Sequence, residues 1–442
     1  MLSNLRIPVS LRALCPALVA AALAVAGIHG AAASGDPSAM PSEVLVKLRS
    51  TQALAALTAK YQLAVLGQFG SRPIYRLSVT GSAGVANTIT ALSLEPDVLL
   101  AEANLTTGTP EAKKNAVWAI GSRDAYTAQW APTAMQLTAA HALSTGVGVR
   151  VAVLDTGVDR THPALAGRLL PGFDFVDYDN DPSEEGNETD VAFGHGTHVA
   201  GLVALVAPGA KIIPVRVLDP AGQGNVWVLA EGLLYAVDPD GNPDTDDGAQ
   251  VINLSLGTAT RTRLFNSVLQ IATCSVNSDP VNDISDPGYD IDDARCSKSR
   301  GIVIVAAAGN DGSGAALEYP AAESSQVLAA VGATADKSRL AGFSNFASWV
   351  RYAAPGDRIT SAVPGGGYGT WSGTSMAAPL FAGTAALVKS ANPSMKPEDI
   401  LRRIGSRSSA LCGSNLRQID ASAALRDTNP AKTICPDRTS GP

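Results

Sequence analysis

Two hydrophobic patterns divide the chain. In its first part, apolar and polar residues alternate over short runs, as in half-buried strands, and helical runs lie between them. The strand runs cover residues 43–48, 74–79 and 98–102, and the helical runs cover residues 52–61 and 85–94. With a further strand near residues 63–69, this order predicts a small ferredoxin-like α+β unit between residues 42 and 104.

The second pattern begins after a polar linker at residues 106–115. Continuous apolar runs then alternate with helical runs. The apolar runs are residues 149–154, 211–218, 250–254, 302–307 and 327–332, and the helical runs are residues 195–206, 226–236 and 375–390. Strands that are apolar throughout are typical of a parallel sheet covered on both faces. We therefore predict an α/β fold of three layers, with a mainly parallel sheet between helices.

The first 33 residues have the pattern of a secretory signal peptide. Arg6 and Arg12 provide positive charge, a mainly apolar stretch covers about residues 14–28, and small residues follow at positions 31–33. A single membrane anchor is the alternative, but the apolar stretch is short and rich in alanine. We expect export to the periplasm or the medium, and we find no other stretch that could span a membrane.

Four cysteines follow the predicted signal peptide, and an even number in an exported chain predicts two disulfides. Three pairings are open. Proximity along the chain favours Cys274 with Cys296 and Cys412 with Cys435.

Three polar residues lie where this predicted fold would place a reactive site. Asp155 follows an apolar strand run, while His195 and Ser375 each open a predicted helix. Parallel sheets bind ligands at the carboxyl ends of their strands, and the free N–H groups of a helix start favour negative charge. A serine, an imidazole and a buried carboxylate are the groups that acyl transfer requires. Asn310, with the Ser375 N–H, would stabilise the oxyanion.

Four segments, in the order Asp, His, Asn, Ser, resemble those of the subtilisin-like (subtilase) family of serine proteases. The segments are residues 151–157, 194–201, 306–310 and 373–379. The resemblance covers about residues 130–427 and implies a secreted serine endopeptidase that needs no cofactor for catalysis. It also implies an inhibitory propeptide at residues 34–114, a catalytic domain at residues 115–427 and a C-terminal tail at residues 428–442.

The resemblance further implies how substrate binds. Two segments would pair with the substrate main chain, and further residues would wall the pocket for the side chain before the cleaved bond. The pairing residues are Ser255, Leu256 and Gly257 on one side and Gly222, Gln223 and Gly224 on the other; the pocket residues are Ala307, Ala308 and Gly309. Glu318 would face the pocket floor and favour Lys or Arg, or else it points to solvent.

An acidic stretch precedes the histidine segment. Asp174, Asp177, Asp179 and Asp181 place four carboxylates within eight residues. Such density suits either a structural calcium ion, as some relatives bind in a similar loop, or a solvated loop. The Asp-rich residues 238–247 present the same choice but lack the terminal glutamate of an EF-hand.

Other functions fit the residues less well. The Asp155-Thr156-Gly157 triplet also occurs in aspartic proteases, but the chain has no second such triplet. His195 and His198 lack the intervening glutamate of zinc proteases, so we expect His198 to be a packed helix residue. The net charge of −7 argues against nucleic-acid binding. We expect a monomer that acts on proteins or peptides. The alternatives are a processing protease of narrow specificity and an inactive binding protein on the same scaffold.

Overall fold

The computed structural model describes residues 38–111, 119–242, 245–273, 301–430, 432–433 and 435. The predicted signal peptide and the pair Cys274 and Cys296 lie outside these residues. None of the described helices is both long enough and apolar enough to cross a membrane.

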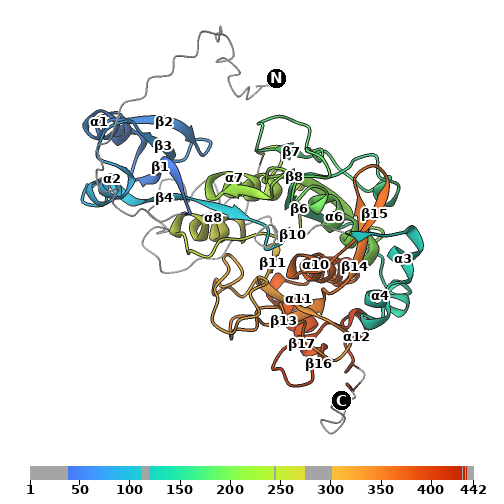
Figure 1. Ribbon diagram of the computed structural model, residues 1–442. Coiled ribbons are helices and arrows are strands. Elements are labelled where there is room, and N and C mark those ends of the chain that lie inside the picture. The colour runs from blue at the N-terminus through green and yellow to red at the C-terminus, as the bar shows by residue number, and fades with distance from the viewer. Residues whose placement is uncertain are drawn as a thin grey trace, which may run out of the picture. The chain divides into compact units, whose positions relative to one another are not determined.

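The N-terminal α+β unit forms as predicted, with four strands and two helices (Figure 1). Its elements are β1 (Ala39–Leu48), the 3-10 turn η1 (Thr51–Ala53), α1 (Leu54–Tyr61), β2 (Leu63–Gln68), β3 (Ile74–Val79), α2 (Val85–Leu92) and β4 (Val98–Gly108). The strands pair antiparallel in the order β2-β3-β1-β4. Alternate residues such as Val44, Val46 and Leu77 bury their side chains in one small core, which explains the alternating sequence pattern.

Strand β4 continues past its own unit. Its last residues, Thr106 to Gly108, pair antiparallel with β9 (Gln223–Asn225). Further back, Asn104 accepts a hydrogen bond from the Trp227 N–H at 3.2 Å, and Glu102 accepts one from the Leu264 N–H at 2.9 Å. These two N–H groups lie at the starts of α7 (Val226–Val237) and α8 (Arg263–Thr273), so one strand satisfies donors that both helices leave open.

The main sheet has nine described strands in the order β16-β17-β13-β12-β11-β10-β6-β8-β7. Every neighbouring pair is parallel except β16 with β17. The strands are β6 (Arg150–Asp155), β7 (Phe173–Asp174), β8 (Lys211–Arg216), β10 (Val251–Leu254), β11 (Val303–Ala307), β12 (Leu328–Thr334), β13 (Tyr352–Pro355), β16 (Ser409–Ala410) and β17 (Arg417–Gln418). The mainly parallel sheet that the apolar runs predict is therefore confirmed.

Helices cover both faces of this sheet, and alternate residues of each strand point to opposite faces. In β6, Val151 and Val153 pack into one core with α6 (His195–Val206) and α10 (Thr374–Ala391). Ala152 and Leu154 pack into the opposite core with α7 and α8. Successive side chains of a strand point to opposite faces, so a strand buried on both sides must be apolar at every position.

The remaining elements are short or lie outside the central layers. They are β5 (Ala119–Ile120), α3 (Arg123–Ala128), α4 (Trp130–Ala134), α5 (Leu137–His141), η3 (Pro163–Leu165), β14 (Ile359–Val363), β15 (Gly367–Trp371), α11 (Pro397–Ser406) and α12 (Ala421–Arg426).

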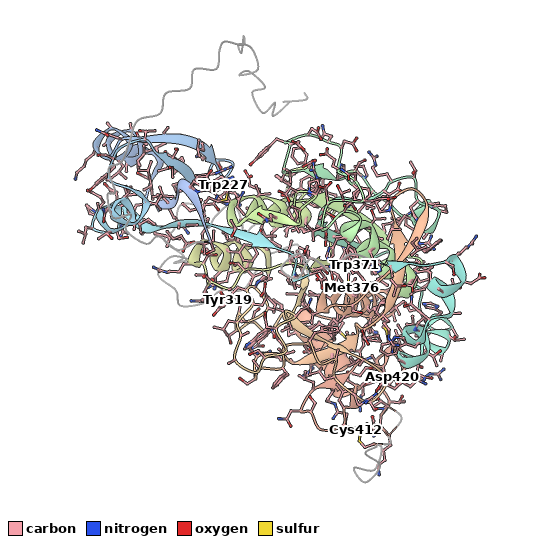
Figure 2. All side chains as sticks on the ribbon, in the orientation of Figure 1. Trp227, Tyr319, Trp371, Met376, Cys412 and Asp420 are labelled. Atoms are coloured by element: carbon pink, nitrogen blue, oxygen red, sulfur yellow. A yellow bond between two sulfur atoms is a disulfide. The ribbon has the colours of Figure 1, made fainter. Side chains whose placement is uncertain are left out.

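A disulfide joins Cys412 to Cys435 with the Cα atoms 5.6 Å apart, which confirms one of the two predicted pairs (Figure 2).

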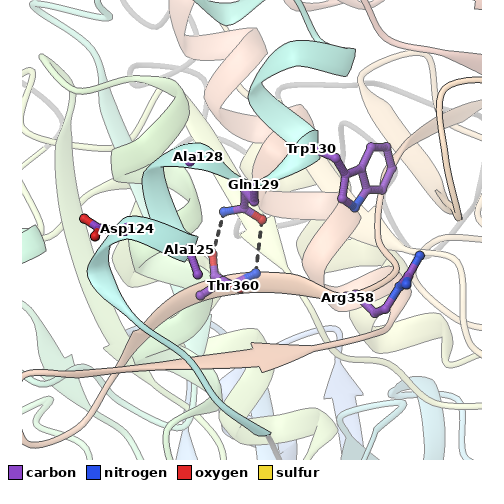
Figure 3. A pocket seen from close by; sticks show the side chains of 7 residues that line it. All are labelled: Asp124, Ala125, Ala128, Gln129, Trp130, Arg358 and Thr360. Atoms are coloured by element: carbon purple, nitrogen blue, oxygen red, sulfur yellow. Dashed lines mark hydrogen bonds between the residues drawn. The ribbon is translucent and has the colours of Figure 1, made fainter.

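A surface hollow of about 560 Å³ lies beside α3 and the start of β14 (Figure 3). The side-chain amide of Gln129 donates to the Thr360 carbonyl at 2.7 Å and accepts from the Thr360 N–H at 3.1 Å. The Gln129 amide therefore pairs with β14 as the main chain of a neighbouring strand would. None of the residues that line the hollow belongs to the predicted catalytic set.

Candidate functional site

The structure brings Asp155 and His195 together. Asp155 is the last residue of β6 and His195 the first of α6, and His195 Nδ1 lies 2.7 Å from Asp155 Oδ1. Both residues are fully buried. The Thr156 N–H donates to the same Asp155 oxygen at 2.8 Å. Parallel strand ends and helix starts meet at one edge of the sheet, which is why a 40-residue sequence separation closes to one hydrogen bond.

The helix start at His195 depends on a glycine. A Cβ atom at Gly196 would lie 2.1 Å from the Gly157 carbonyl oxygen, so α6 can pass the loop after Asp155 only with hydrogen at this position. The rings of Trp371 and His195 pack edge to face with their centroids 5.3 Å apart, which restricts the movement of the imidazole.

Ser375 and Asn310 form the second half of the site. Ser375 lies in the first turn of α10, and Asn310 follows β11 by three residues. The Thr374 N–H and hydroxyl donate to Asn310 Oδ1 at 2.9 and 3.0 Å. Because its oxygen is held in this way, the side-chain amide of Asn310 directs its N–H donors away from Thr374.

Glu111 lies between Ser375, Asn310 and His195, at a position that the sequence does not predict. Ser375 Oγ donates to Glu111 Oε2 at 2.6 Å, and Asn310 Nδ2 donates to Glu111 Oε1 at 2.7 Å. His195 Nε2 lies 3.3 Å from Glu111 Oε2. Glu111 is 2% exposed. Its carboxylate thus contacts the three groups expected to act on a substrate carbonyl.

Glu111 and His195 are buried next to each other, and each shifts the pKa of the other. Burial alone raises the pKa of Glu111, but the contact with His195 and the bonds from Ser375 and Asn310 lower it overall. Burial lowers the pKa of His195, but Asp155 and Glu111 outweigh it and hold that pKa well above the usual range. The carboxylates of Asp155 and Glu111 therefore favour the imidazolium form of His195. By contrast, burial lowers the pKa of His198 to about 3, and its Nε2 lies 3.1 Å from the Ile359 carbonyl. The expectation that His198 is a packed helix residue is confirmed.

The end of the N-terminal unit lies as a strand between the two predicted pairing segments. Gly108 and Gly257 exchange two main-chain hydrogen bonds of 2.9 Å. On the other side, Gly108 pairs with Gln223 and Thr107 with Gly224, and the Thr109 N–H donates to the Gly222 carbonyl at 3.0 Å.

The other predicted pairing residues lie deeper. The Ser255 carbonyl accepts from Ser375 Oγ at 3.2 Å, and the Ser255 hydroxyl donates to the Ser375 carbonyl at 2.8 Å. Leu256 is buried in the core beneath.

Glu318 lies buried beside Gly257 and Gly309 rather than in solvent. It is 1% exposed, so the alternative that it points to solvent is wrong. A Cβ atom at Gly257 would lie 2.6 Å from Glu318 Oε1, and one at Gly309 would lie 3.4 Å from Glu318 Oε2. Ala307 and Ala308, which precede Gly309, are fully buried in the cores next to it. The carboxylate therefore lies between the pairing segment and the segment that leads to Asn310.

The four aspartates predicted to bind calcium do not converge on one point. Asp174 and Asp177 each hold Arg216 Nη1 at 2.6 Å. Asp179 instead accepts from the Asp181 N–H at 2.8 Å, and Asp181 pairs with Arg160 at 3.3 Å. Asp174 and Asp177 lie close enough to Glu185 for the three carboxylates to hold a metal ion, and Arg216 pairs with each of them. Three other carboxylates lie close together on the surface: Asp238, Asp240 and Asp247.

The sequence model of the Subtilase family (Peptidase_S8) matches residues 146–427, which contain Asp155, His195, Asn310 and Ser375. The chain belongs to the subtilase family. It is a subtilisin-like serine proteinase.

Three curated relatives and one solved structure indicate how far the likeness extends. Thermitase of Thermoactinomyces vulgaris is 38% identical over 59% of this chain and 82% of its own length. Subtilisin Savinase of Lederbergia lenta is 36% identical over 67% and 98%. The thermophilic serine proteinase of Bacillus sp. (strain AK1) is 39% identical, but this match spans 55% of the subtilase chain and 52% of the relative.

The fold of this subtilase extends over a larger part of the chain. Fervidolysin from Fervidobacterium pennivorans, described as a keratinolytic enzyme related to subtilisin, superposes with a TM-score of 0.69. The superposition covers 89% of this chain and 62% of fervidolysin at 23% identity, which shows the fold alone.

The Arg216 cluster yields a stability prediction. Arg216→Met leaves the carboxylate of Asp174, which is 1% exposed, without its ion-pair partner, and we expect a loss of about 3–5 kcal/mol in the free energy of unfolding. The matched control Arg160→Met removes an exposed pair with Asp181 and should cost about 1 kcal/mol or less. Urea denaturation with and without EDTA measures both. A midpoint that falls with EDTA but not with Arg216→Met would contradict this role of Arg216.

Proposed function

We propose that this subtilase is a secreted endopeptidase that hydrolyses peptide bonds through an acyl-enzyme on Ser375. The observation that carries the proposal is the convergence of His195, Asn310 and Ser375 on one carboxylate, that of Glu111, beside a slot that holds a peptide strand. In this site a substrate carbonyl would take the place of the Glu111 carboxylate.

The reaction follows from these positions. Ser375 Oγ attacks the carbonyl carbon, and His195 Nε2 accepts the hydroxyl proton while Asp155 holds Nδ1. Negative charge then develops on the carbonyl oxygen, where Asn310 Nδ2 and the Ser375 N–H can donate to it. Collapse breaks the C–N bond, and His195 returns its proton to the leaving amine. Water, deprotonated by the same imidazole, hydrolyses the ester.

The substrate strand is expected to bind as residues 106–109 do. Gly257 and Gly222 offer main-chain groups that any extended peptide can pair with, so this part of the site selects for conformation rather than sequence. Side-chain selection then falls to the pocket next to Ser375.

The N-terminal unit is proposed to act as an inhibitory propeptide, residues 34–114, which is cut between residues 105 and 116 to release the catalytic domain at residues 115–427. The Glu111 carboxylate supports this, because it occupies the nucleophile and oxyanion donors and keeps His195 protonated. Since the pKa of Glu111 is lowered and that of His195 is raised, the contact persists across neutral pH. It weakens as the pH falls through the first pKa or rises through the second. The signal-like first 33 residues and the Cys412–Cys435 disulfide support export.

The primary test is labelling of Ser375. Wild-type protein should react with a fluorophosphonate and cleave casein, while Ser375→Ala should lose the label and at least about 10⁴-fold of the activity. Intact mass of the purified protein shows whether Ser375→Ala also retains its N-terminal unit. An active and fully processed Ser375→Ala protein would contradict both the mechanism and self-cleavage.

Glu111→Gln should weaken inhibition of the precursor. The variant removes one of the two charges that raise the pKa of His195, and Asp155 keeps the other, so uncut protein should label about tenfold faster with fluorophosphonate at neutral pH. Glu95→Gln is a matched control, because Glu95 bonds Lys60 and Tyr61 within the same unit. Labelling is followed by intact mass in the first minutes after purification. Equal rates for wild type and Glu111→Gln would refute the role of this carboxylate.

Glu318 is proposed to favour lysine or arginine before the cleaved bond. A carboxylate buried beneath Gly257 and Gly309 attracts a cation far more strongly than an exposed carboxylate does. We expect kcat/KM for a lysine peptide to exceed that for its leucine counterpart, and Glu318→Gln to reduce the ratio by about tenfold or more. Asp311→Asn, at an exposed acid beside Asn310, controls for general charge effects. Equal effects of the two variants, or no preference in wild type, would rule this specificity out.

A further inference from the structure

Glu184 joins the two elements that carry the Asp155–His195 pair. It lies in the loop between β7 and α6. Thr156 Oγ1, directly after Asp155, donates to Glu184 Oε1 at 2.6 Å. The Thr197 hydroxyl and N–H, in the first turn of α6, donate to Glu184 Oε2 at 2.8 and 3.1 Å. One carboxylate therefore bridges the end of β6 and the start of α6.

A short path of hydrogen bonds connects this bridge to the imidazole. The Thr156 hydroxyl, while it donates to Glu184, accepts from the Gly196 N–H at 2.9 Å. The Thr156 N–H donates to Asp155 Oδ1, the oxygen that also lies 2.7 Å from His195 Nδ1. Because Thr156 has one hydroxyl proton and gives it to Glu184, its lone pairs remain available to the helix. Loss of the Glu184 acceptor would release both the hydroxyl and the loop.

We propose that Glu184 is a positioning residue for the proteinase reaction, which fixes Asp155 against His195 and places a second negative charge behind the pair. The inference rests on the proposed function of Ser375, His195 and Asp155. Glu184 itself contacts neither the substrate strand nor Ser375 among the bonds described.

The charge of Glu184 gives it a role that a neutral hydrogen-bond acceptor would not have. The charge of Asp155, at the end of β6, acts on Glu184. The Asp159 N–H donates to the Thr197 hydroxyl, and the neighbouring Glu185 pairs with Arg216. Burial and the Asp155 charge together raise the pKa of Glu184 to about 7, against the bonds from Thr156 and Thr197 that lower it. Ionised Glu184 stabilises the imidazolium, so its presence raises the pKa of His195 in the active enzyme.

The test compares Glu184→Gln and Glu184→Asp with wild type, using processed enzyme whose active sites are counted with fluorophosphonate. Glu184→Gln should lower kcat about tenfold with KM within about twofold, because ground-state binding of substrate is untouched. It should also move the acid limb of kcat/KM about half a pH unit lower, since a negative charge near His195 is lost. Glu184→Asp retains the charge and should restore the wild-type acid limb while kcat stays reduced.

Two further variants keep the outcome decisive. Glu188→Gln, an exposed glutamate of the same loop, should match wild type in kcat and in pH profile. Thr197→Val removes a donor to Glu184 and should lower kcat. Its combination with Glu184→Gln should cost less than the product of the two single effects.

Specific results would overturn the inference. If Glu184→Gln and wild type share kcat and acid limb, or if kcat falls with no shift of the acid limb, Glu184 does not act on the His195 charge. If Glu184→Gln does not fold, the test passes to Thr197→Val, Glu184→Asp and their combination. If the effects of these two substitutions on kcat and on the pH profile simply add, the proposed role of Glu184 is overturned. If wild type itself neither labels nor cleaves, the proposed function fails instead, and the two failures are thus distinguished.

Discussion

The buried charge of Asp155 is the constraint on which the site depends. A carboxylate with no exposure is costly unless donors surround it, and here the Thr156 N–H and His195 meet one of its oxygens. Thr156 directly follows Asp155, whereas His195 is 40 residues away in the sequence and belongs to α6. The parallel sheet brings them together, because its strand ends and helix starts share one edge. The contacts that position His195 are therefore also the contacts that compensate the buried charge of Asp155.

Strand β4 has a comparable double role. It completes a small antiparallel core with β1 at one end and lies in the slot between Gly222 and Gly257 at the other. Between these ends, Glu102 and Asn104 meet the open N–H groups of α8 and α7. The same strand thus covers the slot and stabilises two helices that pack on the sheet.

The sequence was sufficient for the sheet and for the residues expected to react. Apolar runs such as residues 151–154 are explicit because both of their faces are buried, and the segments around Asp155, His195 and Ser375 are distinctive in composition and order. The position of Glu111 was not predictable, because a polar linker carries no periodic signal and the contacts of this residue are more than 80 positions away.

The surroundings of acidic residues were the hardest feature to predict from the sequence. The sequence allowed Glu318 to face either the pocket or solvent, and the aspartates near Asp174 suggested calcium, although Arg216 lies among them. Local density of charge does not reveal a distant partner in space. Glu184 likewise gave no sequence signal, since its two threonine partners lie on other elements.

The slot between Gly222 and Gly257 is one strand wide, and this has a kinetic consequence. If the N-terminal unit is the propeptide that we propose, a cut unit that still pairs through Gly108 would be a competitive inhibitor produced in equal amount with the enzyme. New molecules would then stay silent until that unit leaves or is itself digested, and digestion needs a second, already free enzyme. Activity in a fresh population would rise autocatalytically after a delay, with the delay set by protein concentration rather than by the rate of the first cut.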